Sequence, residues 1–196
     1  EHPDTLSSMS NLAITLGSQG DLPGARALQE QVLALRRRVL GDEHPDTLSS
    51  MNNLAGTLVT AGDLSGARAL QERVLAAHSR VHGDEHPDTL RSMNNLASTI
   101  RKQGDLAGAR ELQERVLTDS RRVLGEEHRD TLNAMNNLAI TLWHMKECAA
   151  ALSMMQVAAA GRAKVLGPDH PDALTSRKLV QQMQTTTAPS RRTQSP

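Results

Sequence analysis

A six-residue block returns along this chain at a constant interval, and this repeat constrains the fold more than any other feature of the sequence. The block EHPDTL begins at Glu1, Glu43 and Glu85, and close variants begin at Glu127 and Asp169. The starting positions are 42 residues apart. A period of roughly 20–50 residues is typical of proteins in which each copy is one supersecondary unit. The sequence therefore predicts four full copies (1–42, 43–84, 85–126 and 127–168) and a truncated fifth that ends near residue 184.

Each copy has the pattern of two helices. In the second copy the first predicted helix spans 45–61, and its apolar residues recur every three or four positions: Leu48, Met51, Leu54, Ala55 and Leu58. Proline is favoured at the first helical position, and a glycine favours a left-handed stop, as at Gly62. The second predicted helix spans about 65–82, with an apolar stripe of Ala67, Leu70, Val74 and Leu75. No segment alternates with a period of two, so we expect no strands.

One such helix pair cannot bury its apolar stripe alone, whereas stacked copies close a core between neighbours. We therefore expect an all-α, right-handed superhelical solenoid of antiparallel helix pairs, forming one repeat domain over residues 1–184. A capping helix is expected from about 170 to 184, where the repeat pattern gives way to polar residues. The polar, Pro/Ser/Thr-rich segment 185–196 is predicted to be a disordered tail. Because the first copy has no matching cap, we expect the chain to be part of a longer array.

The composition excludes several functional classes. The chain has 22 basic and 22 acidic residues and no phenylalanine or tyrosine, so it lacks the basic surface and the stacking side chains of nucleic-acid binders. No apolar run reaches the roughly 18 residues that a membrane helix needs. Cys148 is the single cysteine, which excludes a disulfide framework and fits a cytoplasmic location. We expect Cys148 to be a small core residue.

No catalytic constellation is visible in the sequence. It contains neither a glycine-rich phosphate loop nor a nucleophile elbow. The Glu-His-x-Asp cluster of each connector is the only group of metal-type ligands, and its copies lie one repeat apart, whereas a closed zinc site needs four converging ligands. We interpret the cluster as a proline-started helix with acids that complement the helix dipole. The prediction is a protein that is not an enzyme and that uses no cofactor and no metal.

The segment Gly-Asp-Leu-x-Gly-Ala, about nine residues after Asn-Leu-Ala, resembles the tetratricopeptide repeat. The 42-residue unit with its His-Pro-Asp connector is similar to the kinesin light chain subtype of that family. The resemblance covers residues 1 to about 184. It departs from the family where an aromatic is usual on the first helix, since Leu16, Leu58, Ile100 and Leu142 stand there, and where Lys146 replaces the turn glycine. The array is also similar to the C-terminal sensor regions of bacterial and fungal nucleotide-binding ATPases.

The resemblance implies a concave wall built from the first helix of each copy, with ligand-facing residues around Asn-Asn-Leu-Ala. On this sequence the implied peptide-binding residues are Asn52, Asn53, Asn94, Asn95, Arg101, Lys102, Asn136, Asn137, Trp143 and His144. An independent argument supports the asparagines, because an Asn-Asn pair in mid-helix lowers helix propensity and an amide can bond a peptide backbone. The alternative is that one asparagine of each pair bonds to a neighbouring helix and only spaces the repeats.

The predicted groove is uneven along its length. Arg101, Lys102, Trp143 and His144 are of types enriched at interaction hot spots or carry positive charge, which favours a peptide with acidic residues; the alternative for Trp143 is a partly buried packing residue. We predict a non-catalytic scaffold that binds a peptide or protein segment. One alternative is self-association by end-to-end stacking of repeats into a homo-oligomer. Another is the sensor region of a larger nucleotide-binding signalling ATPase.

Overall fold

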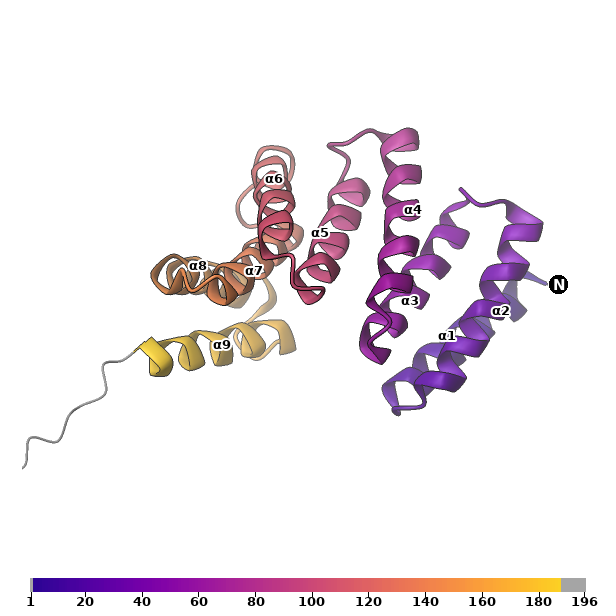
Figure 1. Cartoon of the computed structure of the whole chain (residues 1–196), viewed down its shortest axis with the longest axis horizontal. Helices are drawn as coiled ribbons and strands as arrows, with labels where there is room; N and C mark the ends of the chain where they lie inside the picture. The colour runs from indigo at the N-terminus through magenta and orange to yellow at the C-terminus, as the bar shows by residue number, and fades with distance from the viewer. Residues whose placement is uncertain (1, 188–196) are drawn as a thin grey trace, which may run out of the picture. The chain divides into compact units, whose positions relative to one another are not determined.

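The computed structural model describes residues 2–187, and this part of the chain consists of helices joined by short turns (Figure 1). Over that range there are nine helices and no strand. They are α1 (Pro3–Ser18), α2 (Leu22–Leu40), α3 (Pro45–Ala61), α4 (Leu64–His82), α5 (Pro87–Lys102), α6 (Leu106–Leu124), α7 (Arg129–His144), α8 (Cys148–Leu166) and α9 (Pro171–Thr187). The predicted all-α fold of helix pairs is confirmed, and the bounds predicted for the second copy agree within one residue. None of the described helices is both long and apolar enough to span a membrane.

The chain divides into two compact units, Glu1–Gly104 (unit 1) and Asp105–Pro196 (unit 2). Unit 1 holds α1–α5 and unit 2 holds α6–α9, and within each unit every helix packs against the next one along the chain. The single repeat domain over 1–184 remains a prediction. Helix α9 continues to Thr187, beyond the predicted end of the capping helix, and the rest of the predicted tail lies outside the described residues.

The Gly-Asp-Leu-x-Gly motif builds the turn between the two helices of a copy. Gly62 ends α3 with φ 87°, in the left-handed region that favours glycine. Asp63 then caps α4, because its Oδ1 accepts a hydrogen bond from the backbone N–H of Gly66 at 2.9 Å. A Cβ on Gly66 would lie 2.8 Å from the Asp63 carboxylate, so any larger residue there would force the capping side chain to shift.

The histidine of each connector is also a helix cap. His44 Nδ1 accepts a hydrogen bond from the backbone N–H of Asp46 at 3.2 Å, and the equivalent bonds at His86, His128 and His170 measure 3.2, 3.1 and 3.2 Å. The proline follows at the first helical position of α3, α5 and α9, where its missing N–H is not needed. The capping role of the histidine explains why the Glu-His-x-Asp block recurs, and it supports our interpretation of the block as a helix start.

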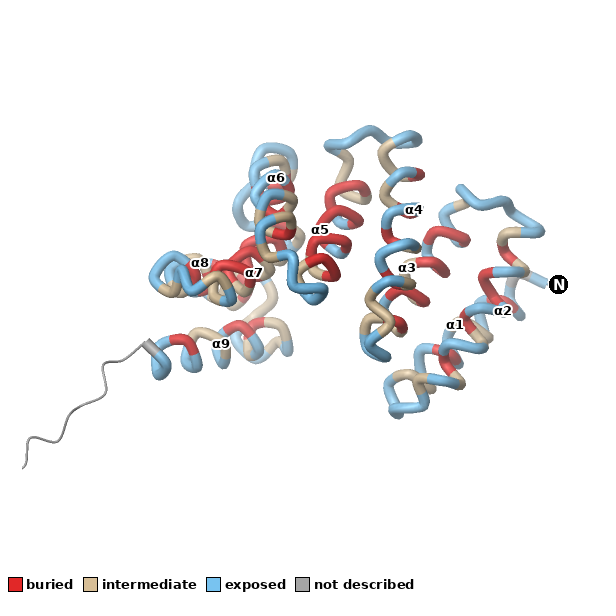
Figure 2. Tube along the Cα trace, viewed as in Figure 1, coloured by how far each residue is buried: buried red, intermediate tan, exposed pale blue. Residues whose placement is uncertain are grey.

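The apolar stripe predicted for α3 lies in the core of unit 1, whereas two of the four stripe residues predicted on α4, Leu70 and Leu75, are only half-buried. All five residues of the α3 stripe are buried, and they pack with Leu33 of α2 and with Ala67, Val74 and Ala77 of α4. Figure 2 shows the buried positions as a band along α3 and α5. In unit 2 a smaller cluster joins Ala139, Met155 and Met183, which come from α7, α8 and α9. The capping helix α9 is thus held by apolar contacts with the fourth copy.

Hydrogen bonds join each second helix to the first helix of the next copy. Arg36 Nη1 donates to Ser50 Oγ at 2.7 Å, and the Ser50 hydroxyl donates onward to the carbonyl oxygen of Asp46 at 3.0 Å. In unit 2, Arg162 repeats this arrangement with Ser176 at 2.6 Å. We call this pattern the inter-copy relay. It fixes the register of one copy on the next, because the donor and the serine lie on different copies.

At the junction of the second and third copies, His78 takes the place of the arginine. Its Nδ1 lies 2.8 Å from Ser92 Oγ, and the Ser92 hydroxyl donates to the carbonyl oxygen of Asp88 at 2.9 Å. Since the serine proton is used in that bond, Nδ1 of His78 must be the donor to Ser92. Burial lowers the pKa of His78 below its ordinary value of 6.5, while Asp88 acts in the opposite direction.

The turn of the fourth copy departs from the motif, as the sequence indicated. Lys146 replaces the turn glycine and has a φ of 68°, a conformation that costs free energy in a residue with a Cβ. Glu147 makes no side-chain cap bond, unlike the aspartates at the equivalent positions. Cys148 is a free cysteine and is half-buried, not the fully buried core residue we expected. It begins α8, at a helix end where neighbouring side chains cover it only in part.

Candidate functional site

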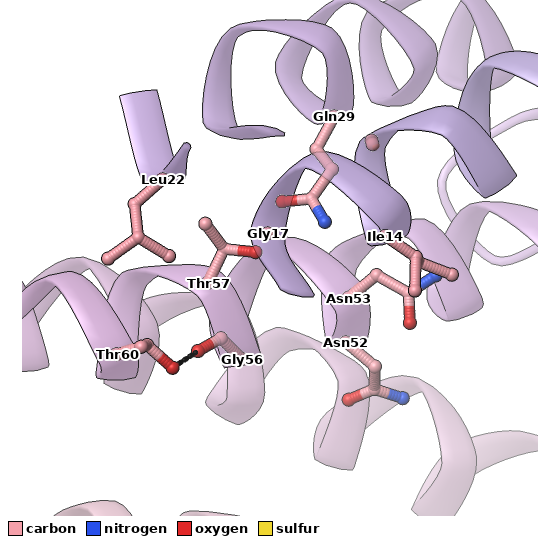
Figure 3. Close-up of a pocket in the computed structure, with 10 residues that line it drawn as sticks. Ile14, Gly17, Leu22, Gln29, Asn52, Asn53, Gly56, Thr57 and Thr60 are labelled. Carbon is pink, nitrogen blue, oxygen red and sulfur yellow. Dashed lines mark hydrogen bonds between the residues drawn. The ribbon is translucent and has the colours of Figure 1, made fainter. Parts of the chain in front are cut away.

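Three hollows lie along α1, α3 and α5 in unit 1. The first has a volume of about 280 Å³ between α1 and α3 and is shown in Figure 3. The second, about 230 Å³, lies between the C-terminal halves of α3 and α5. The third, about 620 Å³, lies between their N-terminal halves and the end of α4. Asn52 lines all three hollows, and we refer to them together as the unit 1 groove.

The two members of each asparagine pair in the third and fourth copies differ in burial. The first members, Asn94 and Asn136, are buried at 9% and 8% exposure. The side chain of Asn136 is part of the inter-copy relay, since its Oδ1 accepts from Arg162 Nη1 at 3.1 Å and from Ser176 Oγ at 3.3 Å. This is the alternative we considered for one asparagine of each pair, and burial places both residues in packing contacts.

Other asparagines lie at the surface of unit 1. Asn52 and Asn53 are half-buried and Asn95 is exposed. All three line hollows of the unit 1 groove, and within residues 2–187 their side-chain amides have no hydrogen-bond partner. An amide without a partner keeps its donors and its acceptor available to a ligand. In unit 2 the second member of the pair, Asn137, is half-buried.

The two predicted cations at the end of α5 differ in position. Lys102 is exposed and lines the hollow between α3 and α5, and no residue of the described chain forms an ion pair with it. Arg101 is half-buried, its Nε has no hydrogen-bond partner among residues 2–187, and burial lowers its pKa. Because Arg101 lines none of the three hollows, the cation without an ion pair that lines the groove is Lys102.

The two predicted residues at the end of α7 have local contacts. Trp143 is half-buried and packs against the cluster of Ala139, Met155 and Met183. This agrees with the alternative in which the tryptophan is a packing residue. His144 is exposed, and its Nδ1 lies 2.7 Å from the carbonyl oxygen of Ile140, one turn back on the same helix. Both side chains thus have contacts within unit 2 that account for their positions.

The structure adds residues that our sequence analysis did not single out. Gln29 and Gln71 come from α2 and α4, are only 5% and 7% exposed, and line the hollows beside α3. A signal was present, because each glutamine lies four residues after a buried alanine and three before a buried valine. A polar residue on an apolar stripe at the same place in successive copies indicates a role beyond core packing.

Comparisons with known proteins agree with this architecture. Models described as "Tetratricopeptide repeat" match residues 5–46, 47–88 and 88–164. No curated protein sequence matches the chain significantly. A crystal structure from Podosopora anserina, described as a kinesin light chain with nearly identical TPR-like repeats, is 30% identical over 95% of this chain and 90% of its own, with a TM-score of 0.73. A variant of that protein with one substitution is 29% identical over 95% and 94% of the two chains, also at 0.73.

A more distant structure has the same fold. BtubC (BKLC) from P. vanneervenii is 20% identical, and the match covers 92% of this chain and 80% of that one with a TM-score of 0.67. At that identity the likeness concerns the arrangement of helices. It shows that this helical arrangement is kept although four residues in five differ.

Proposed function

The chain belongs to the tetratricopeptide repeat family, in its kinesin light chain-like type, and from this premise we propose that it binds an extended peptide segment in the unit 1 groove. The family is one of protein–protein interaction scaffolds without catalytic activity. The proposal for this chain is accordingly a binding function, without catalysis and without a cofactor. We include the cytoplasmic location in the proposal, because a single unpaired cysteine suits a reducing compartment.

The observation that carries the proposal is the set of free amides in the groove. Asn52, Asn53 and Asn95 come from α3 and α5 and line hollows on both sides of α3. An extended peptide has one N–H and one C=O per residue, and side-chain amides can bond both. Because the helices are already folded, the protein loses little conformational entropy when the peptide binds.

The charge of the groove favours an acidic segment. Lys102 projects a positive charge at the C-terminal end of the α3–α5 hollow. The other charged residues that line the groove have partners: Arg91 pairs with Asp88, and Glu43 pairs with Arg80. A carboxylate on the bound peptide near Lys102 would therefore meet an unpaired cation, which raises both the association rate and the selectivity for acidic partners.

A peptide library displayed against the purified chain tests this function. Selected peptides should bind the wild type and lose about tenfold or more in affinity with Asn52→Ala/Asn95→Ala, since at least one hydrogen bond is lost at each asparagine. Lys102→Glu should weaken acidic peptides selectively. Lys164→Glu makes the same charge change on α8, outside the unit 1 groove, and should leave affinity unchanged. Equal binding by all these variants would refute the proposal.

A second candidate function, self-association, is favoured by the exposed face of α1. Leu12 on α1 is 54% exposed. The equivalent leucines of the later copies, Leu54, Leu96 and Leu138, are only 5%, 6% and 3% exposed. We propose as the alternative that this face packs on another copy of the chain. Sedimentation over a range of concentrations, with Leu12→Glu as the disrupting variant, tests it. A monomer at all concentrations would exclude this function.

A further inference from the structure

Two side-chain amides at the floor of the unit 1 groove are buried without a partner. The side chains of Gln29 and Gln71 form no hydrogen bond with any of residues 2–187, and the Oε1 atom of each is fully buried. Burying an amide without a hydrogen bond is unfavourable, and such groups are rare in folded proteins. Each of the two amides borders a hollow large enough to admit another group.

The equivalent glutamine of unit 2 is bonded within the fold. Gln113 is completely buried, and its Oε1 accepts a hydrogen bond from Thr141 Oγ1 at 2.6 Å, while its Nε2 has no partner among residues 2–187. The threonines equivalent to Thr141 in unit 1 are Thr57 and Thr99, which line the same hollows as Gln29 and Gln71 but do not bond to them. The hydrogen bond between this glutamine and this threonine is therefore present in unit 2 and absent at both equivalent positions of unit 1.

The fourth copy shows that the fold does not need an amide at this position. Met155 is the equivalent residue there, and it is fully buried in the core of unit 2. Methionine and glutamine have similar length, so the position accepts an apolar side chain without a change in volume. A glutamine kept at the two hollows, and left unpaired there, is better explained by a ligand than by packing.

We propose that Gln29 and Gln71 are floor subsites that each receive an asparagine or glutamine side chain of the bound segment. This inference rests on the proposed peptide-binding function and specifies the partner's residues. A primary amide carries both a carbonyl and an NH₂ group. Once the glutamine side chain turns so that its Oε1, buried in the free protein, faces the hollow, the ligand amide can accept from Nε2 and donate to Oε1 in one reciprocal pair. In Figure 3 the Gln29 amide points toward the space bordered by Gly17, Asn53 and Thr57.

The pairing also gives selectivity. A carboxylate in the same place has no N–H to donate, so Oε1 of the glutamine would stay unpaired, and an aliphatic side chain would leave both amide groups unpaired. A site built to hydrogen-bond a ligand group discriminates strongly against a ligand that lacks it. The segment should therefore combine amide side chains at the floor with acidic residues near Lys102.

The first test uses stability and needs no ligand. Gln71→Met and Gln29→Met should leave the thermal midpoint unchanged or raise it, because each removes an unpaired buried amide. Gln113→Met is the matched control at the same repeat position, and it should give a lower midpoint than the two unit 1 variants. It alone removes a hydrogen bond, the one from Thr141 Oγ1 to Gln113 Oε1, although Thr141 keeps its 3.2 Å bond to the carbonyl oxygen of Asn137. If the two unit 1 variants lose as much stability as Gln113→Met, their amides are satisfied within the fold and the inference is wrong.

The second test uses the peptides selected from the library on the wild type. They should be enriched in asparagine and glutamine, and Gln71→Met should weaken them about tenfold, as expected for one lost hydrogen bond to a buried group. Replacing the peptide amide by leucine should have the same effect on the wild type but no further effect on the Gln71→Met variant. Gln113→Met should bind these peptides as the wild type does.

The outcomes separate this inference from the function on which it rests. Peptides that need Asn52 and Asn95 but bind equally well to Gln29→Met/Gln71→Met would overturn the glutamine subsites and leave the groove function standing. Peptides without an excess of amide residues would do the same. A folded protein that selects no groove-binding peptide would overturn both.

Discussion

Replacing Arg162 by methionine should destabilise unit 2 by about 2–3 kcal/mol. Arg162 is only 8% exposed, and its guanidinium donates to three side-chain acceptors. Nη1 bonds Asn136 Oδ1 at 3.1 Å and Ser176 Oγ at 2.6 Å, and Nη2 bonds Asn133 Oδ1 at 2.6 Å. Burial disfavours the charged guanidinium and lowers its pKa, and the three hydrogen bonds offset this desolvation cost.

The magnitude follows from which groups lose their partners. Ser176 keeps its bond to the carbonyl oxygen of Asp172 at 3.1 Å, so it remains satisfied in the variant. The buried Asn136 and the half-buried Asn133 each lose the guanidinium. A lost hydrogen bond to a charged group, or a buried amide left unsatisfied, costs roughly 1–3 kcal/mol. Methionine refills most of the volume of the arginine stem, so we expect little additional cavity cost. The removal of a desolvated charge offsets part of the loss.

Trp143 makes the measurement direct, because this single tryptophan packs against the apolar cluster of unit 2 and its fluorescence should follow the unfolding of that unit. Urea denaturation followed by this fluorescence gives the free energy of unfolding. Lys164→Met is the control, since it removes the exposed ion pair with Glu127 and should cost less than about 0.5 kcal/mol. If the Arg162 variant differs from this control by less than about 1 kcal/mol, the inter-copy relay contributes little and our reasoning about it fails.

Three further predictions concern the turns and junctions. Lys146→Gly should stabilise unit 2 by about 1 kcal/mol in the same fluorescence assay, because the residue has a φ of 68°; a loss of stability would show that the lysine side chain has a favourable role. Gly66→Ala should destabilise unit 1 through the clash with its aspartate cap, whereas Gly56→Ala, which meets no atom within 4 Å, should stabilise it by about 0.5–1 kcal/mol in circular dichroism melts. The pKa of His78 in the folded protein lies below 6.5, so between that pKa and 6.5 the unfolded chain binds more protons than the folded one. The free energy of unfolding should therefore fall as pH drops through 6.5 toward the folded pKa. His78→Arg should flatten this pH dependence of stability, and an unchanged pH profile would rule out His78 as its source.

Much of the fold followed from local features of the sequence. The period of 42 residues and the spacing of residues such as Leu48, Met51 and Leu58 are sufficient to place a helix and its buried face. These are properties of one helix and its turn, which is why the predicted bounds of α3 and α4 agree with the structure. The departure at Lys146 was also visible, since a left-handed turn has a known preference for glycine.

The candidate site was predicted less completely. The family resemblance predicted that the first helix of each copy forms the binding wall, and Asn52, Asn95 and Lys102 do line a hollow there. It could not tell which asparagine of a pair would be buried, because that depends on the residue supplied by the next copy. The buried Asn136 is bonded to Arg162 and Ser176, and neither is near it in the sequence.

What the sequence determined by itself is the repeat: its length, its two helices, their caps and the apolar stripe of each, all of which arise from interactions within a few residues. Only the tertiary structure decided how each polar side chain on those stripes is paired. The glutamines show the reason most clearly, since Gln71 and Gln113 stand in nearly identical sequence contexts. Gln113 bonds Thr141, while Gln71 borders an open hollow beside Thr99. A hydrogen bond depends on a few tenths of an ångström between helices of different copies, and local sequence does not specify that separation.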